Sequence, residues 1–165
     1  MVGIISEGRT RQFGPPELVY NRPADQFVAR FLGEANILAA NAARSTVDTA
    51  LGRLELAEGN RCLERPVWVL LRPEQLTLQP LPLGSSPTAR ATGRVAHIEF
   101  YGHDCAVLVS SADGKGPLRV RCPGRPPVHL GELVTISARG EVTAWPRPRP
   151  PAPAGPLEVP KASTK

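Results

Sequence analysis

The sequence predicts a mainly β protein, in which a small barrel follows a short helical segment. Short apolar or alternating stretches, separated by turn residues, fill residues 36–145 and are typical of strands. Several short strands at such spacing indicate a small barrel. A hydrophobic content of 41% is sufficient for a core, and 165 residues accommodate one small domain with appendages.

The helical segment is expected within residues 1–34. Gly14, Pro15 and Pro16 break the chain, and the prolines preset the backbone for a helix that begins at Glu17. A second helix is predicted over residues 23–32, because its apolar side chains fall on one helical face. Those side chains are Phe27, Val28, Phe31 and Leu32. Gly33 then fits a left-handed C-terminal cap.

The barrel is expected within residues 35–145. Its predicted strands are 36–39, 46–50, 53–56, 67–71, 75–79, 90–101, 105–110, 118–122, 133–139 and 142–145. Residues 81–87 are too rich in Pro, Gly and Ser to be structured, so they form a linker. Residues 111–116 are expected to connect a hairpin, with Asp113-Gly114 supplying positive φ angles. The proline-rich tail, residues 146–165, is expected to be disordered or extended.

The net charge of +5 does not indicate a nucleic-acid-binding protein. From Pro146 onward the tail carries four basic residues against one Glu, which is +3 of the +5. The body is therefore only about +2, with mixed signs, whereas strong backbone binding needs a clustered basic patch on a folded face. We interpret the tail as solvated rather than as a nucleic-acid arm.

The remaining composition excludes several other classes. No apolar run approaches the roughly 20 residues that span a bilayer, and the N-terminus lacks the basic region of a signal peptide. We therefore expect a cytoplasmic chain without direct membrane insertion. Three widely spaced cysteines indicate neither a disulfide framework nor a zinc site, and three isolated histidines predict no metal site. Cys105 lies in an apolar stretch and is expected to pack as a small hydrophobe.

Four sequence blocks carry a family resemblance. They are GPPELVYNRP at 14–23, FVARFLGEAN at 27–36, LRPE at 71–74 and RVAHIEFYGHDCAVLVS at 94–110. In this order and spacing they resemble the end of the ATPase domain of an importer-type ABC transporter and the TOBE (transport-associated OB) domain that follows it. The resemblance implies an OB-like barrel, and it is greatest to the iron(III), polyamine and related importers.

What the sequence lacks is equally informative. It contains no G-x-x-x-x-G-K-[ST] loop to cradle phosphates, no apolar strand ending in Asp-Glu for magnesium, and no L-S-G-G-Q signature. We therefore expect no cofactor and no ATP hydrolysis by this chain, although the full-length family uses ATP and magnesium. Residues 4–9 are interpreted as a remnant of the last ATPase strands, as in a truncated or split gene or a mis-assigned start.

The resemblance implies a role and a set of partners. In the family, two ATPase subunits lie under two permeases, and their C-terminal barrels hold the dimer at the cytoplasmic face of the membrane. We therefore expect a homodimer that contacts permeases only through a full-length ATPase domain. The candidate dimer or regulatory contacts are Phe27, Phe31, Arg72, Glu74, His103 and Asp104.

Some of these residues have a second interpretation. Because Arg72 precedes a proline it is held extended, and it is expected to pair with Glu74, to meet a partner surface, or to form an exposed pair of negligible energy. Pro73 should end or bulge the preceding strand. Gly102 permits a tight turn in which Asp104 accepts backbone N–H bonds, and this structural role is favoured over a ligand site.

An alternative function belongs to another class, a free-standing OB-type module that binds a small oxyanion or single-stranded nucleic acid. Nucleic-acid OB folds stack bases on aromatic residues along a basic groove. Here the aromatic residues are few and the basic residues near them are not clustered, so the nucleic-acid version is disfavoured. An oxyanion site would use backbone amides and hydroxyl groups at a dimer seam. A sequence neither shows nor excludes such a site, so this version remains an alternative.

Overall fold

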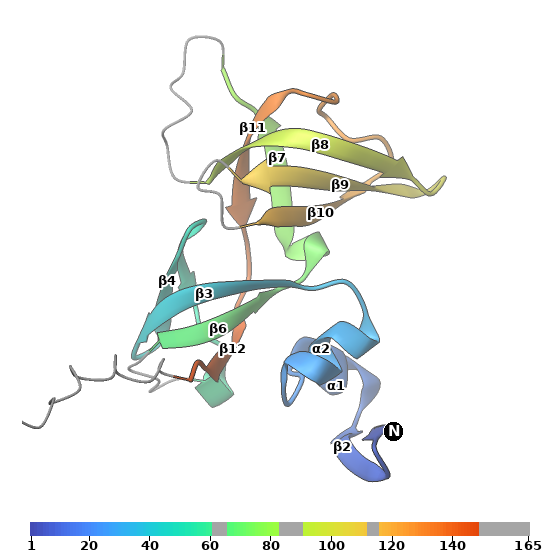
Figure 1. Cartoon of the computed structure of the whole chain (residues 1–165), viewed down its shortest axis with the longest axis vertical. Helices are drawn as coiled ribbons and strands as arrows, with labels where there is room; N and C mark the ends of the chain where they lie inside the picture. The colour runs from blue at the N-terminus through green and yellow to red at the C-terminus, as the bar shows by residue number, and fades with distance from the viewer. Residues whose placement is uncertain (61–65, 83–90, 112–115, 149–165) are drawn as a thin grey trace, which may run out of the picture.

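A computed structural model describes residues 1–60, 66–82, 91–111 and 116–148. Two five-stranded antiparallel sheets lie one above the other, and a helical segment with an N-terminal hairpin packs beside the lower one (Figure 1). The elements are β1 (Val2–Ser6), β2 (Arg9–Gly14), α1 (Pro16–Asn21), α2 (Gln26–Leu32), β3 (Asn36–Ala43), β4 (Thr46–Thr49), β5 (Gly52–Glu55), η1 (Glu58–Asn60), β6 (Pro66–Leu71), η2 (Pro73–Gln75), β7 (Leu76–Pro80), β8 (Thr92–Phe100), β9 (Asp104–Ser111), β10 (Pro117–Pro123), β11 (Leu133–Ala138) and β12 (Thr143–Pro146).

The first sheet, in the order β12-β6-β3-β4-β5, closes on itself. Beyond the end of β5, Leu56 forms a parallel bridge with Val142, and the N–H of Val142 donates to the carbonyl of Glu55 at 2.9 Å. The amide of Asn60 extends this seam along β12, since it donates to the carbonyl of Ala144 at 2.8 Å and accepts from its N–H at 3.1 Å. The result is a small five-stranded barrel with no open edge at this seam.

The second sheet has the order β10-β9-β8-β11-β7, and its edge strands β10 and β7 lie next to each other. One apolar cluster fills both sheets, with Val69 and Leu71 from the first and Val107 and Val120 from the second among its fully buried members. We call the two sheets together the β-domain. The predicted mainly β, OB-like fold is confirmed, but its strands form two sheets around this shared core.

Cys105 packs in the core as expected, fully buried on β9 opposite Cys122 on β10. Burial raises the pKa of the Cys122 thiol to about 11, and burial also raises that of Cys105. Both thiols are therefore protonated at neutral pH and act as apolar packing groups.

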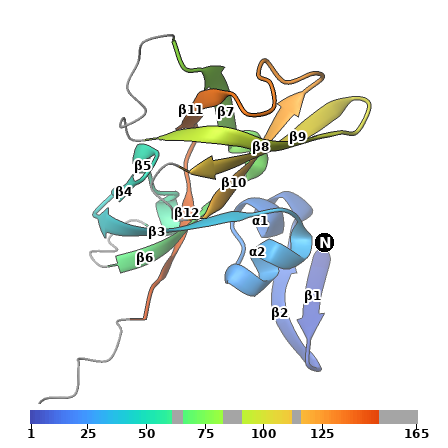
Figure 2. The ribbon, with the colours of Figure 1, turned by 45° about the horizontal axis from the view of Figure 1, so that its top comes forward.

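The second helix ends at Leu32 as predicted, but its start and the conformation of its C-terminal cap differ from the prediction. The helix begins at Gln26 rather than at residue 23, because Asp25 is its N-cap and accepts from the N–H of Val28 at 2.9 Å. Gly33 has φ 161°, which is extended backbone, so the predicted left-handed cap is wrong. Figure 2 shows α1 and α2 between the β1–β2 hairpin and β3. No helix in the described ranges is long and apolar enough to cross a membrane.

The strand predictions hold with shifted ends. β3 continues to Ala43, four residues past its predicted end, and the strand expected from residue 75 begins at Leu76 after a 3-10 turn. β6 ends at Leu71, as Pro73 requires. Most of the predicted linker, most of the 111–116 connection and most of the tail lie outside the described residues, and so does the predicted start of β8.

Gly93 provides a stability test of the second sheet. A Cβ at this position would lie 2.5 Å from Cγ1 of Val109 and 2.6 Å from the carbonyl oxygen of Ser110, so strand β9 would have to shift. We expect Gly93→Ala to lower the free energy of unfolding by about 1–3 kcal/mol in urea titrations. The matched control is Gly59→Ala, where a Cβ meets nothing within 4 Å, and it should change stability by less than about 0.5 kcal/mol. Equal effects of the two substitutions would contradict this packing.

Candidate functional site

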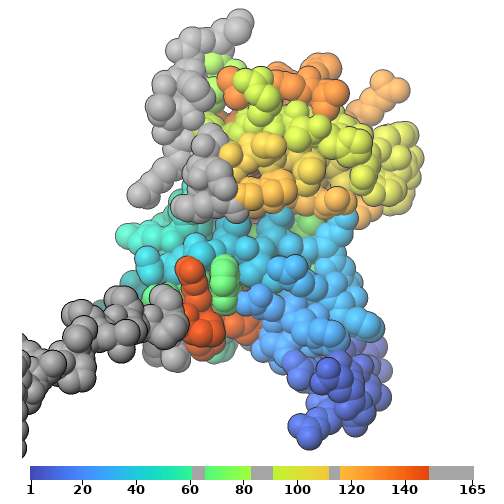
Figure 3. Space-filling view, in the orientation of Figure 1, coloured from blue at the N-terminus to red at the C-terminus, as the bar shows by residue number. Residues whose placement is uncertain are grey.

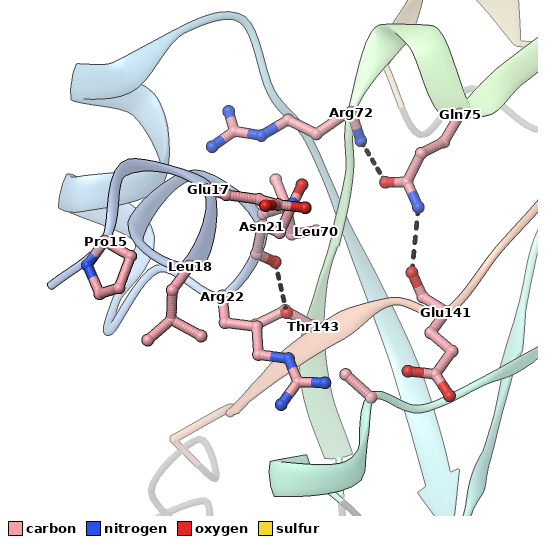
Figure 4. A pocket seen from close by; sticks show the side chains of 11 residues that line it. Pro15, Glu17, Leu18, Asn21, Arg22, Leu70, Arg72, Gln75, Glu141 and Thr143 are labelled. Carbon is pink, nitrogen blue, oxygen red and sulfur yellow. Dashed lines mark hydrogen bonds between the residues drawn. The ribbon is translucent and has the colours of Figure 1, made fainter.

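Arg72 lies where the β-domain meets the helices. It follows the last residue of β6 and precedes Pro73, and its φ of −70° and ψ of 144° are the extended angles that a following proline enforces. The side-chain oxygen of Gln75 accepts from the Arg72 N–H at 2.9 Å and fixes this bend. The Arg72 side chain consequently leaves the sheet and extends toward α1 and α2 (Figure 4).

The Arg72 guanidinium binds the ends of both helices. Nη1 donates to the carbonyls of Ala29 at 2.8 Å and Glu34 at 3.2 Å, while Nη2 donates to the carbonyl of Tyr20 at 3.0 Å. Carbonyls in the last turn of a helix lack intrahelical partners and carry the negative end of the helix dipole. One side chain from the β-domain therefore caps α1 and α2 together. We call Tyr20, Ala29, Glu34, Arg72 and Glu74 the junction.

Tyr20 connects Arg72 with Glu74. The guanidinium carbon lies 4.1 Å from the centre of the Tyr20 ring, and the Tyr20 hydroxyl donates to Glu74 at 2.7 Å. Burial and then the bond to Glu74 raise the pKa of Tyr20, and burial lowers the pKa of Arg72. Arg72 is only 3% exposed, so the expected exposed Arg72–Glu74 pair is wrong, while a regulatory role of Arg72 stays a prediction.

Asn36 is a second connecting residue, to which the sequence analysis gave no role. Its buried amide donates to the carbonyls of Leu71 at 3.2 Å and Arg119 at 2.8 Å, and its oxygen accepts from the Arg119 N–H at 2.8 Å. It thereby joins β3 and β6 of the first sheet to the free edge of β10 in the second. The available signal was a polar residue at the head of an apolar strand, at the end of the FVARFLGEAN block.

Glu74, His103 and Asp104 line one pocket beside the junction, of about 550 Å³. Its other lining residues are Tyr20, Arg121, Pro123 and Arg139. The LRPE and FYGHD blocks therefore meet in space. Gly102, with φ 89°, makes the predicted turn. The Asp104 carboxylate, however, pairs with the Arg121 guanidinium rather than with backbone N–H groups, and this bond is the main cause that lowers the pKa of Asp104.

A second pocket, of about 570 Å³, lies on the other side of Arg72 (Figure 4). Its lining residues are Pro15, Glu17, Leu18, Asn21, Arg22, Ala57, Leu70, Arg72, Gln75, Glu141 and Thr143. The Thr143 hydroxyl donates to the carbonyl of Asn21 at 3.0 Å, and the Trp145 indole donates to that of Pro23 at 3.0 Å. Strand β12 therefore holds the end of α1 through polar contacts.

Phe27 and Phe31 lie apart from the junction, on the exposed face of α2. Their side chains are 42% and 64% exposed, and their rings stack with centroids 6.0 Å apart. Arg11 on β2 lies over the Phe27 ring at 5.5 Å. The β1–β2 hairpin projects at one corner of the molecule (Figure 3). Their role as partner contacts stays a prediction, and the same holds for Glu74, His103 and Asp104.

The described ranges bring together no three His, Cys, Asp or Glu side chains that could hold a metal ion. The groups around the two pockets are ion pairs and backbone-directed hydrogen bonds. Their chemistry is that of a joint between structural units.

Comparison with known proteins identifies the domain that the two sheets contain. Residues 69–144 match the model of the TOBE domain. Curated relatives named Fe(3+) ions import ATP-binding protein FbpC are 29% identical over 140 residues in Yersinia enterocolitica and 32% identical over 149 residues in Rhodococcus jostii. The chain contains a TOBE domain and is similar to the ATP-binding subunits of importers. The two matches cover 85% and 88% of this chain but 40% and 41% of those relatives, so this TOBE-domain chain spans about two fifths of their length.

A solved structure is also similar. The cytoplasmic molybdate-binding protein ModG, with molybdate bound, superposes with a TM-score of 0.45 and 14% sequence identity. The superposition covers 66% of this TOBE-domain chain and 94% of the ModG chain.

Tyr20 gives the junction a distinctive pH dependence. The raised pKa means that folded Tyr20 keeps its proton at a pH where the unfolded residue, with a pKa near 10, has lost it. The folded state then binds more protons, so stability is fully present below about pH 10 and is lost as the pH rises through the folded pKa. We expect the urea midpoint of the wild type to fall more between pH 8 and pH 11 than that of Tyr20→Phe.

The Tyr20→Phe variant also supplies its own control at neutral pH. It lacks the hydrogen bond to Glu74 and should be less stable by about 0.5–1.5 kcal/mol at pH 7. Other groups that titrate at high pH are common to both proteins, so only the difference between the two curves reports on Tyr20. Parallel curves would refute the linkage.

Proposed function

We propose that this chain is the C-terminal regulatory and dimerisation part of the ATP-binding subunit of an ABC importer. The TOBE domain and the function named for the relatives, Fe(3+) ion import, support this role. The transported solute is Fe(3+), a polyamine or a similar solute. The chain itself has no ATP site, since its sequence has none of the phosphate-binding or magnesium-binding motifs.

The observation that carries the proposal is the junction. Arg72 binds α1 and α2 to the β-domain, while α2 exposes Phe27 and Phe31 on its other face. A structural unit that packs on those aromatic rings is then connected to the β-domain through the junction, with the buried Arg72 at its centre. This arrangement suits a regulatory domain, which has to follow the movement of the unit to which it is attached.

The proposed partners follow from the same role. A second copy of this chain forms a homodimer, and permease subunits are reached only through a full-length ATPase domain that binds ATP and magnesium. The complex then works at the cytoplasmic face of the inner membrane.

The absence of an ATP site is tested with the purified chain. We expect no Mg-ATP hydrolysis, and no affinity for Mg-ATP tighter than about 1 mM in calorimetric titrations, because no loop cradles the phosphates. Hydrolysis that follows the protein through successive purification steps would overturn this part of the proposal.

The dimer is tested by sedimentation at micromolar concentration. Phe27 and Phe31 each contribute about 1.5–3 kcal/mol when they are fully buried, so the exposed face of α2 favours a partner. We expect the wild type to sediment as a homodimer and Phe31→Asp to shift it toward the monomer, because a carboxylate is costly to bury.

Phe100→Asp is the matched control for the dimer. Phe100 is similarly exposed, at 61% against 64% for Phe31, but it lies at the end of β8 and away from α2. The dimer should survive this change. A wild type that remains monomeric at high concentration would refute the dimer and favour the small-ligand binding module.

A further inference from the structure

The helical segment and the β-domain have separate apolar cores. Ile4, Val19 and Val28 form a small cluster of their own, to which Val2 and Leu32 add partly buried side chains. None of these residues belongs to the large cluster that fills the two sheets. Apolar burial is the main source of stability in a fold, so what attaches the helical segment must be sought among polar contacts.

The polar contacts between the two parts centre on Arg72. It donates three side-chain bonds of 2.8–3.2 Å, two to carbonyls in the last turns of α1 and α2 and one to the carbonyl of Glu34 just after α2, and it covers the Tyr20 ring. The other bonds across the boundary are single ones, from Tyr20 to Glu74, from Thr143 to Asn21 and from Trp145 to Pro23, and Glu34 pairs with Arg119. Arg72 is thus the side chain on which α1 and α2 both depend.

The helices are not self-sufficient. α1 has six residues and α2 has seven, and helices of this length are marginal without tertiary contacts. Without the guanidinium, the carbonyl of Ala29 would lose a buried hydrogen bond and that of Tyr20 a half-buried one, and an unsatisfied buried acceptor costs more than the bond itself contributes. Both helices should therefore lose their ordered ends at the same time.

The charge of Arg72 makes the attachment reversible. In the described part of the chain no carboxylate lies within ion-pair distance of the guanidinium, and its Nε atom is buried without a partner. Carbonyl dipoles, the Tyr20 ring and the more distant Glu74 carboxylate balance the charge only in part, so the desolvation of the cation opposes the attached state. Opening the junction returns the guanidinium to water.

We propose that Arg72 is a latch: α1 and α2 detach from the β-domain as one unit when its bonds break, and both sheets stay folded. This opening requires less free energy than global unfolding. The chain then has two states, a closed one in which the Arg72 bonds are formed and an open one in which the helical segment is detached. The hydrogen bond from Tyr20 to Glu74 also stabilises the closed state.

Hydrogen exchange of the full chain, followed by mass spectrometry, tests the latch. Arg72→Met keeps an apolar stem and removes the guanidinium. We expect exchange of the amides in residues 16–32 to become at least about tenfold faster. Amides of β9 and β10 should keep their wild-type rates. Arg72→Lys, a point charge that cannot reach both helix ends in the same way, should give an intermediate rate in residues 16–32.

Arg94→Met is the matched control, since Arg94 also donates to a carbonyl, that of Gly131, at 2.6 Å but on the surface of the second sheet. It should leave residues 16–32 unchanged. Unchanged exchange of α1 and α2 in Arg72→Met would overturn the proposal. Faster exchange by the same factor throughout the chain would overturn it too, because Arg72 would then be a general stabilising residue.

If Arg72→Met does not fold, wild-type exchange in a series of low urea concentrations decides. The latch requires α1 and α2 to share one opening reaction that lies below the opening of β9 and β10. Separate openings of the two helices, or opening together with the sheets, would refute it.

Discussion

The guanidinium of Arg72 is the interaction on which the arrangement of this chain depends. Two helices too short to be stable by themselves end at one point, and a cation from the adjoining sheet satisfies the carbonyls of both. Tyr20 then places its ring against the cation and its hydroxyl on Glu74. The junction consists of polar contacts between two separate apolar cores. Hydrogen bonds depend on direction, so they fix the orientation of the helices more closely than apolar contact alone would.

Much of this fold could be predicted from the sequence, because most strands are bounded by strong turn signals. Pro73 ends β6, and Gly102 makes the turn before β9, as expected from their backbone preferences. Two details of α2 differ from the prediction for different reasons. Asp25 sets the start of the helix through a local N-cap bond to Val28, whereas Gly33 is extended because a tertiary contact, Arg72, satisfies the helix end.

Of the residues that the sequence singles out, Glu74, His103 and Asp104 share one pocket, and the buried Arg72 lines the other. Their arrangement could not be predicted, and their role as partner contacts stays a prediction. The hydrogen-bond acceptors of Arg72 could not be predicted, because they are backbone carbonyls. Every residue carries such a group, so no residue type in the sequence indicates them. Asn36 was missed for the same reason, since all three of its bonds are to backbone groups.

The position of strand β12 in the sequence affects how this fold forms during synthesis. The first barrel uses the chain from Asn36 to Leu71 and is completed by Thr143–Pro146, after every strand of the second sheet has passed. On a ribosome, β5 and β6 therefore emerge as unpaired edges and stay so until the last strand is made. Such edges invite pairing with other chains, and a long-range closure of this kind is slow. The strands of the second sheet, β7 to β11, follow one another in the chain, so this sheet can form first. Strands β3 to β6 can then pack on it before β12 completes the first sheet.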